Sequence, residues 1–159
     1  AALLATLLPI ERLILPDRQA GVLDQLTLRG WSDEMVAAAK IIGQLFAFAL
    51  PLLVATIIAS ALIGLPEAKL FTLLIGLALA LPALSGLSVT IAALTAGLNG
   101  ASALGGLLLI PLAIPILIFG AGTLAETPGN AMQLLAATSL AIAALSPFAA
   151  GAALKAGRG

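Results

Sequence analysis

Long uncharged stretches alternate with short polar segments along this sequence, and the charges divide it into distinct pieces. Of its seven basic and seven acidic residues, nine lie between Glu11 and Lys40. The other five are Glu67, Lys69, Glu126, Lys155 and Arg158. A helix needs roughly 20 consecutive apolar residues to cross a bilayer. The uncharged, apolar residues 41–66 and 127–154 therefore each predict one membrane crossing.

The uncharged stretch 70–125 is too long for one crossing and predicts two. Its natural break is Gly97-Leu98-Asn99-Gly100, because Gly and Asn favour turns. The expected spanning helices lie at 38–63, 69–96, 102–124 and 129–153, and a re-entrant segment within 70–125 is the alternative. The apolar start of residues 1–10 is too short to span and lacks the charged start of a secretory signal. We expect it to be the end of a helix whose beginning is missing.

Composition places the chain in the membrane class, because 62% of its residues are apolar and only 9% are charged. A soluble domain is typically about 25% charged. The absence of Cys and His excludes disulfides, zinc sites of the usual kind and His-based acid–base catalysis. A net charge of zero gives no general attraction to nucleic acid. Together with the lack of a nucleotide-binding glycine loop, this predicts a single all-α membrane domain over 1–159 that is not an enzyme.

Orientation follows from the basic residues near the helix ends. Four crossings place the segment 11–40, the turn at 97–101 and the C-terminal tail 154–159 on one side, with six of the seven basic residues. The other side has only Lys69. The predicted location is therefore a bacterial inner membrane, with the segment 11–37 and the C-terminus in the cytoplasm.

The segment 11–37 is the only substantial polar part of the chain. Pro16 is expected to end the preceding helix, and Asp17 to cap a short helix that runs to about Arg29. Gly30 would end that helix, and Ser32 would cap the next one.

Val22, Leu23 and Leu26 share one face of this short helix by their spacing. That face either lies at the lipid surface, with Trp31 as an interfacial anchor, or docks in a groove of a cytosolic protein. The residues themselves leave both possibilities open.

Several motifs of the chain resemble the CcmB family, the B subunit of the bacterial haem exporter of cytochrome c maturation. The first set comprises Ile10-Glu11-Arg12-Leu13, Asp17, Gly21-Val22-Leu23-Asp24-Gln25-Leu26 and Lys40. Residues 93–98, 110–120 and 145–149 agree as well, so the resemblance covers nearly the whole chain. Val22, where the family often has Ser or Thr, and Asn99-Gly100, where it usually has basic residues, depart from the pattern.

The resemblance implies an ABC-2-type permease bundle that pairs with a cytosolic ATPase, CcmA, and with the membrane proteins CcmC and CcmD. Together they deliver haem to the periplasmic chaperone CcmE, with ATP bound by the ATPase and no cofactor bound by this chain. The short helix becomes the coupling helix. Its implied ATPase contacts are Glu11, Arg12, Asp17, Gly21, Val22, Leu23, Asp24, Gln25 and Leu26.

Haem is usually ligated by His, Cys, Met or Tyr, and this chain has only Met35 and Met132 of these types. Strong haem ligation is therefore not expected. This leaves two functions open, a permease that exports haem and an ATP-powered adaptor that remodels the complex without conducting haem.

Five prolines fall inside the expected spanning helices, where each removes a backbone donor and favours a kink. These kinks are either moving joints of a transporter or static features of membrane helices. They are Pro51, Pro82, Pro111, Pro115 and Pro147.

Overall fold

The computed structural model describes residues 10–96, 101–127 and 129–157, with the backbone alone described at 10–13 and 101–103. The described part is helical apart from its turns and contains no strand. Its helices are α2 (Ile10–Gln19), α3 (Val22–Leu28), α4 (Asp33–Leu62), α5 (Glu67–Thr95), α6 (Ala101–Gly122) and α7 (Ala131–Ala156).

Four of these helices, α4 to α7, are long and apolar enough to cross a membrane, which confirms the predicted fold class. Two helices, α5 and α6, occupy the long uncharged stretch, and each is continuous, so no re-entrant segment occurs there among the described residues. The predicted turn at 97–100 lies outside the described residues. The protein is therefore a multi-pass helical membrane protein.

The first spanning helix begins at Asp33, five residues before its expected start at 38. The cause lies in its first turn, where Ser32 Oγ accepts a hydrogen bond from the Met35 N–H at 3.2 Å. Asp33 and Glu34 follow the cap, where acids favour the positive end of the helix dipole. The polar start is thus a properly capped extension of the membrane helix.

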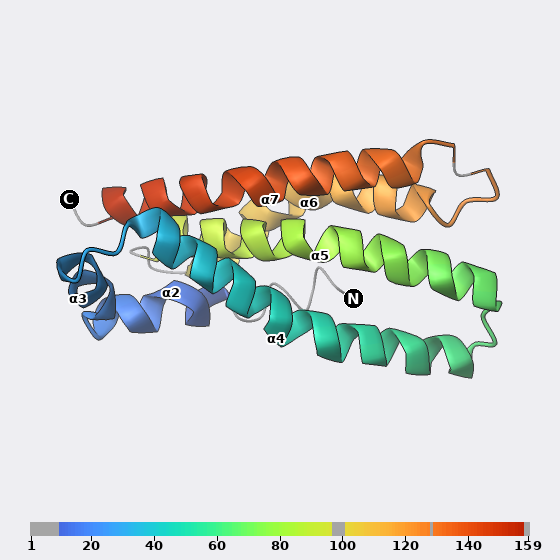
Figure 1. Cartoon of the computed structure of the whole chain (residues 1–159), viewed down its shortest axis with the longest axis horizontal. Coiled ribbons are helices and arrows are strands. Elements are labelled where there is room, and N and C mark those ends of the chain that lie inside the picture. The colour runs from blue at the N-terminus through green and yellow to red at the C-terminus, as the bar shows by residue number, and fades with distance from the viewer. Residues whose placement is uncertain (1–9, 97–100, 128, 158–159) are drawn as a thin grey trace.

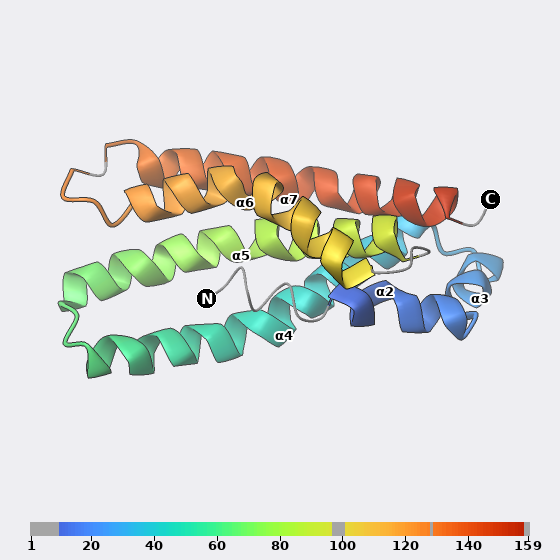
Figure 2. The same ribbon diagram turned by 180° about the vertical axis from the view of Figure 1, so that it is seen from behind.

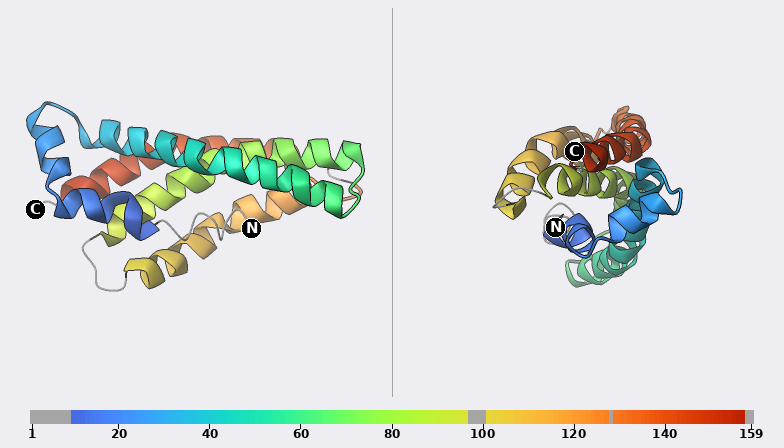
Figure 3. Two further views of the ribbon diagram at one scale, coloured as in Figure 1. Left: turned by 90° about the horizontal axis from the view of Figure 1, so that it is seen from below. Right: turned by 90° about the vertical axis from the view of Figure 1, so that its left-hand side faces the viewer.

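The spanning helices run back and forth, so that their ends gather into two groups (Figures 1 and 2). The short helices α2 and α3 lie at one end, beside the start of α4 and the last turns of α5 and α7. The turns that follow α4 and α6 lie at the other end. Seen end-on, α4 and α6 lie on opposite sides of α2 (Figure 3).

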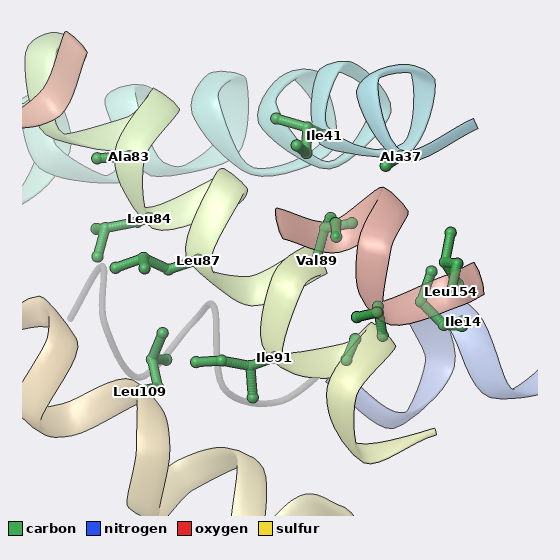
Figure 4. Close-up of a cluster of buried hydrophobic side chains, with 14 of the residues drawn as sticks. Ile14, Ala37, Ile41, Ala83, Leu84, Leu87, Val89, Ile91, Leu109 and Leu154 are labelled. Carbon is green, nitrogen blue, oxygen red and sulfur yellow. The ribbon is translucent and has the colours of Figure 1, made fainter. Parts of the chain in front are cut away.

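The central helix of the bundle is α5, in which every residue from 83 to 89 is buried. In Figure 4 its side chains meet Ile41 of α4, Leu109 of α6 and the pair Ile14 and Leu154 from α2 and α7. Each of the other long helices therefore packs its core residues on α5.

The tightest helix contact joins α5 to α7. A Cβ added at Gly86 would lie 2.7 Å from Ser146 Cβ, so only glycine permits this approach. The Ser139 hydroxyl donates a hydrogen bond to the Leu79 carbonyl across the same interface. In lipid, where burial of apolar surface supplies little force between helices, such close packing and polar contacts drive association.

Hydroxyl side chains elsewhere in α5 bond to helix carbonyls, as expected for Ser and Thr in membrane helices. Ser88 Oγ donates to the Leu84 carbonyl at 2.7 Å, and Thr95 Oγ1 to the Ile91 carbonyl at 2.8 Å. Thr90 Oγ1 donates to the Gly86 carbonyl at 2.8 Å. Ser85 is the exception, since its buried hydroxyl has no partner among the described residues.

The five prolines all lie inside helices that continue past them. Pro51, Pro111 and Pro115 face outward, whereas Pro82 and Pro147 are partly buried. A role for them in movement stays a prediction.

The arrangement predicts which positions are accessible from outside the cell. The natural sequence has no cysteine, so an introduced one would be the only one. A cysteine at Ala68, at the start of α5, or at Thr127, in the turn after α6, should react with a membrane-impermeant maleimide in intact cells, because both lie at the end of the bundle opposite α3. A cysteine at Lys155 should react only after permeabilisation. Equal labelling of both groups in intact cells would contradict the four-crossing arrangement.

The α5–α7 contact predicts a stability effect. Gly86→Ala should lower the free energy of unfolding in detergent by about 1–3 kcal/mol, as overpacking of a filled interface does. Gly43→Ala is the matched control, because nothing lies within 4 Å of its added Cβ. It should be neutral or stabilise by up to about 1 kcal/mol, through helix propensity alone. Equal thermal stability of the two variants would refute the close contact.

Candidate functional site

The helices α2 and α3 and the turn after them form an elbow, defined here as residues 14–32, that packs against one end of the bundle (Figure 1). The prediction that Pro16 ends a helix and Asp17 caps the next is wrong. Helix α2 runs through both residues to Gln19, and the Ala20 N–H still donates to the Pro16 carbonyl at 2.9 Å. The chain turns instead at Gly21, whose φ of 72° lies in the left-handed region that glycine adopts without strain.

The end of α3 forms a Schellman motif. Gly30 has a φ of 86°, its N–H donates to the Thr27 carbonyl at 3.0 Å, and the Trp31 N–H donates to the Leu26 carbonyl at 3.1 Å. The predictions that Gly30 ends the short helix and that Ser32 caps the next one are confirmed. These caps fix the direction in which α3 leads into α4.

The apolar face of α3 points into the chain's own bundle. Leu23 is 6% exposed and lines a cavity of about 400 Å³ with Ala93 of α5 and Leu154 of α7. Leu26 is half-buried beside Trp31. The expectation that Leu23 occupies a partner's groove or the lipid surface therefore needs correction, since the bundle covers it, and for Val22 and Leu26 the expectation stays a prediction.

The outward face of α3 includes Val22 of the predicted apolar face and residues outside that face. Leu28 is 87% exposed, and Val22 is 38% exposed. Asp24, Gln25 and Arg29 are exposed around them. Of the predicted contact residues, Gly21, Val22, Asp24 and Gln25 are thus accessible to some degree, and Leu28 is an apolar surface residue that the helical spacing did not indicate.

Three predicted contacts remain, and all lie on α2; one of them, Asp17, pairs with Lys40 of the same chain. Glu11 and Arg12 belong to the first turn of α2, and their side chains lie outside the described ones. Glu11 lies roughly 12 Å along the helix axis from Gln19, the last residue of α2, at 1.5 Å per residue.

Two charged neighbours near the end of α2 bind different helices. Asp17 forms a salt bridge with Lys40 of α4, and the Arg18 guanidinium donates a hydrogen bond to the carbonyl of Gly157. Gly157 is the C-terminal cap of α7, so Arg18 satisfies one of its end carbonyls at the negative end of the helix dipole. The salt bridge borders a second cavity, of about 320 Å³, between the elbow and α4.

The described residues offer a binding surface and no reactive centre. They contain no group of three His, Cys, Asp or Glu arranged for a metal ion. Met35 is exposed in the first turn of α4, and Met132 is partly buried at the start of α7. An apolar cavity of about 290 Å³ lies between α5 and α6, and Thr123 supplies its polar side chain.

Four helices long and apolar enough to span a membrane, with α4, α6 and α7 packed on α5, fit an all-α membrane permease. The sequence profile of the CcmB family, described as CcmB protein, matches residues 1–157. The chain belongs to the CcmB family.

Proteins named heme exporter protein B are similar to this chain over nearly its whole length. Heme exporter protein B of Haemophilus influenzae is 37% identical over 98% of this chain and 72% of its own length. The protein of that name from Paracoccus denitrificans is 38% identical over 97% of this chain and 73% of its own length. That from Escherichia coli K12 is 35% identical, with 98% and 73% covered.

Proposed function

We propose that this chain is the membrane subunit of an ATP-driven ABC transporter complex that exports haem for c-type cytochrome biogenesis. The supporting observation is family membership over residues 1–157, together with relatives named heme exporter protein B. A cytosolic CcmA-like ATPase hydrolyses ATP, CcmC-like and CcmD-like proteins are membrane partners, and a CcmE-like chaperone receives haem. The chain itself is not catalytic.

The proposed location is the bacterial inner membrane with the elbow in the cytoplasm. Arg18, Arg29, Lys40 and Lys155 lie at the elbow end, and Lys69 lies at the other. This asymmetry supports a cytoplasmic elbow and C-terminus, because basic residues are retained on the cytoplasmic side. The ATPase then meets the chain at the elbow.

Within the elbow, α3 is the proposed coupling helix, and its outward face is the proposed contact with the ATPase. Leu28 is an apolar side chain at 87% exposure, flanked by the exposed Gln25 and Arg29. Burial of such a leucine in a partner's groove stabilises a complex by about 1.5–3 kcal/mol. Leu23, on the opposite side of α3, fixes this helix to the bundle.

This assignment predicts that Leu28→Asp prevents docking without harming the permease. A buried unpaired charge costs on the order of 2–5 kcal/mol, and a loss of about 3 kcal/mol weakens association more than a hundredfold. The ATPase should no longer co-purify, while the variant accumulates in the membrane with unchanged thermal stability.

The matched variant is Leu23→Ala, which removes a buried side chain from the same helix. It should lower the free energy of unfolding by about 2–5 kcal/mol. Leu28→Ala should leave that free energy within about 0.5 kcal/mol. Full recovery of the ATPase with Leu28→Asp would overturn the docking assignment.

The second candidate function is an adaptor that uses ATP hydrolysis to remodel the complex and release the loaded chaperone, without conducting haem. The residue types favour it, because the sequence has no His, Cys or Tyr to ligate haem and because the charges of its spanning helices lie only near the helix ends. Haem is then cargo of the complex rather than of this chain.

Haem titration of the purified chain and flux in sealed vesicles separate the two functions. Both predict weak, non-stoichiometric haem binding to this chain alone, because only Met35 and Met132 are ligands of the usual types. A one-to-one complex with a sharp low-spin spectrum would contradict that expectation. ATP-dependent haem flux by the whole complex supports the exporter, and haem-stimulated ATP hydrolysis without flux supports the adaptor.

A further inference from the structure

The inference rests on the proposed function of α3 and concerns the two charged residues that precede it. We propose that Asp17 and Arg18 are positioning residues that transmit movement of α3 to two spanning helices, α4 and α7. Asp17 acts through Lys40, and Arg18 acts through the Gly157 carbonyl.

The two residues reach different helices because they are neighbours on α2. Successive residues of an α-helix project about 100° apart. Asp17 therefore turns toward α4 while Arg18 turns toward the end of α7. A displacement of the last turn of α2 therefore acts on α4 and α7 at the same time.

Each contact borders a cavity that separates the elbow from the bundle. The cavity of about 320 Å³ on the α4 side is lined by both Asp17 and Lys40, with Trp31 beside them. The cavity of about 400 Å³ on the α7 side is lined by both Arg18 and Gly157. Apolar packing is incomplete beside each cavity, so a charged contact adds to the apolar contacts by which the elbow engages the bundle.

Arg18 is more important for coupling α3 to α7 than Asp17 is for coupling α3 to α4. Helix α4 follows α3 after a short turn, so the chain itself already joins them. Helix α7 is more than 100 residues away in sequence, and its end meets α2 through Arg18. The start of α4 also packs closely on α7, since a Cβ at Gly151 would lie 2.9 Å from the Glu34 nitrogen. The contacts of Asp17 and Arg18 therefore reach two helices, α4 and α7, that also pack on each other.

These contacts contribute little to folding, and their function can therefore be tested separately. Partly exposed ion pairs add little stability, and the side chains of Lys40 and Asp17 are 21% and 39% exposed. The elbow is fixed mainly by Ile14, which is fully buried in the core, and by Leu23. Loss of a charge should leave the elbow in place.

The test uses the whole complex with Arg18→Gln or Asp17→Asn. Haem delivered to the periplasmic chaperone per ATP hydrolysed is measured, along with ATPase co-purification and thermal stability. Both variants should retain the ATPase and its hydrolysis rate, while delivery per ATP falls at least about fivefold, equivalent to about 1 kcal/mol of lost coupling. The exchange of Asp17→Lys with Lys40→Asp should restore more delivery than Asp17→Lys alone.

Lys155→Gln is the matched control, since it removes an exposed charge from the same last turn of α7. It should leave delivery per ATP unchanged. Unchanged delivery per ATP in both Arg18→Gln and Asp17→Asn would overturn the inference, and so would a loss of thermal stability as large as that of Leu23→Ala. Failure of the ATPase to co-purify with the natural chain would instead overturn the proposed function.

Discussion

The close approach of α5 and α7 at Gly86 is the contact on which the rest of the bundle depends. In lipid, two apolar helices gain little by leaving the acyl chains, so association requires close packing and hydrogen bonds between them. Gly86 provides the space, and Ser139 provides a hydroxyl that bonds to the backbone of α5. The resulting pair forms the surface on which α4 and α6 pack, and Ile14 of α2 joins the same core (Figure 4).

This arrangement supports the proposal that the elbow is the contact with the ATPase. Leu23 and Ile14 attach it to the end of the α5–α7 pair, and the caps at Gly30 and Ser32 set the entry into α4. What remains on the surface is a short helix face with Leu28 at its most exposed point. A rigid connection on the inner side and an apolar residue on the outer side are the two properties that a coupling element requires. The proposed coupling helix α3 has both.

The sequence predicts much of the fold, because the bilayer imposes a simple rule on it. Charges are excluded from the hydrocarbon, so the uncharged intervals mark the four spanning helices. The caps at Gly30 and Ser32 were predictable because each depends on local geometry. The prediction that Pro16 ends a helix was wrong, because the loss of one backbone donor does not end a helix that the surrounding bundle supports. The surroundings of Leu23 were not predicted, because helical spacing identifies an apolar face without identifying what covers it. The contacts of Asp17 and Arg18 join residues far apart in sequence, so no local pattern indicates them.

The central claim is that α3 meets the ATPase by its outward face, and site-specific photocross-linking in native membranes tests it most directly. A photoreactive amino acid at Leu28 should form an ultraviolet-dependent product with the ATPase subunit. The same amino acid at Leu140, an exposed residue of α7 inside its spanning stretch, should not. A product with the ATPase from position 28 alone is the result that we predict. Its absence at 28 in a complex that retains the ATPase would contradict the account.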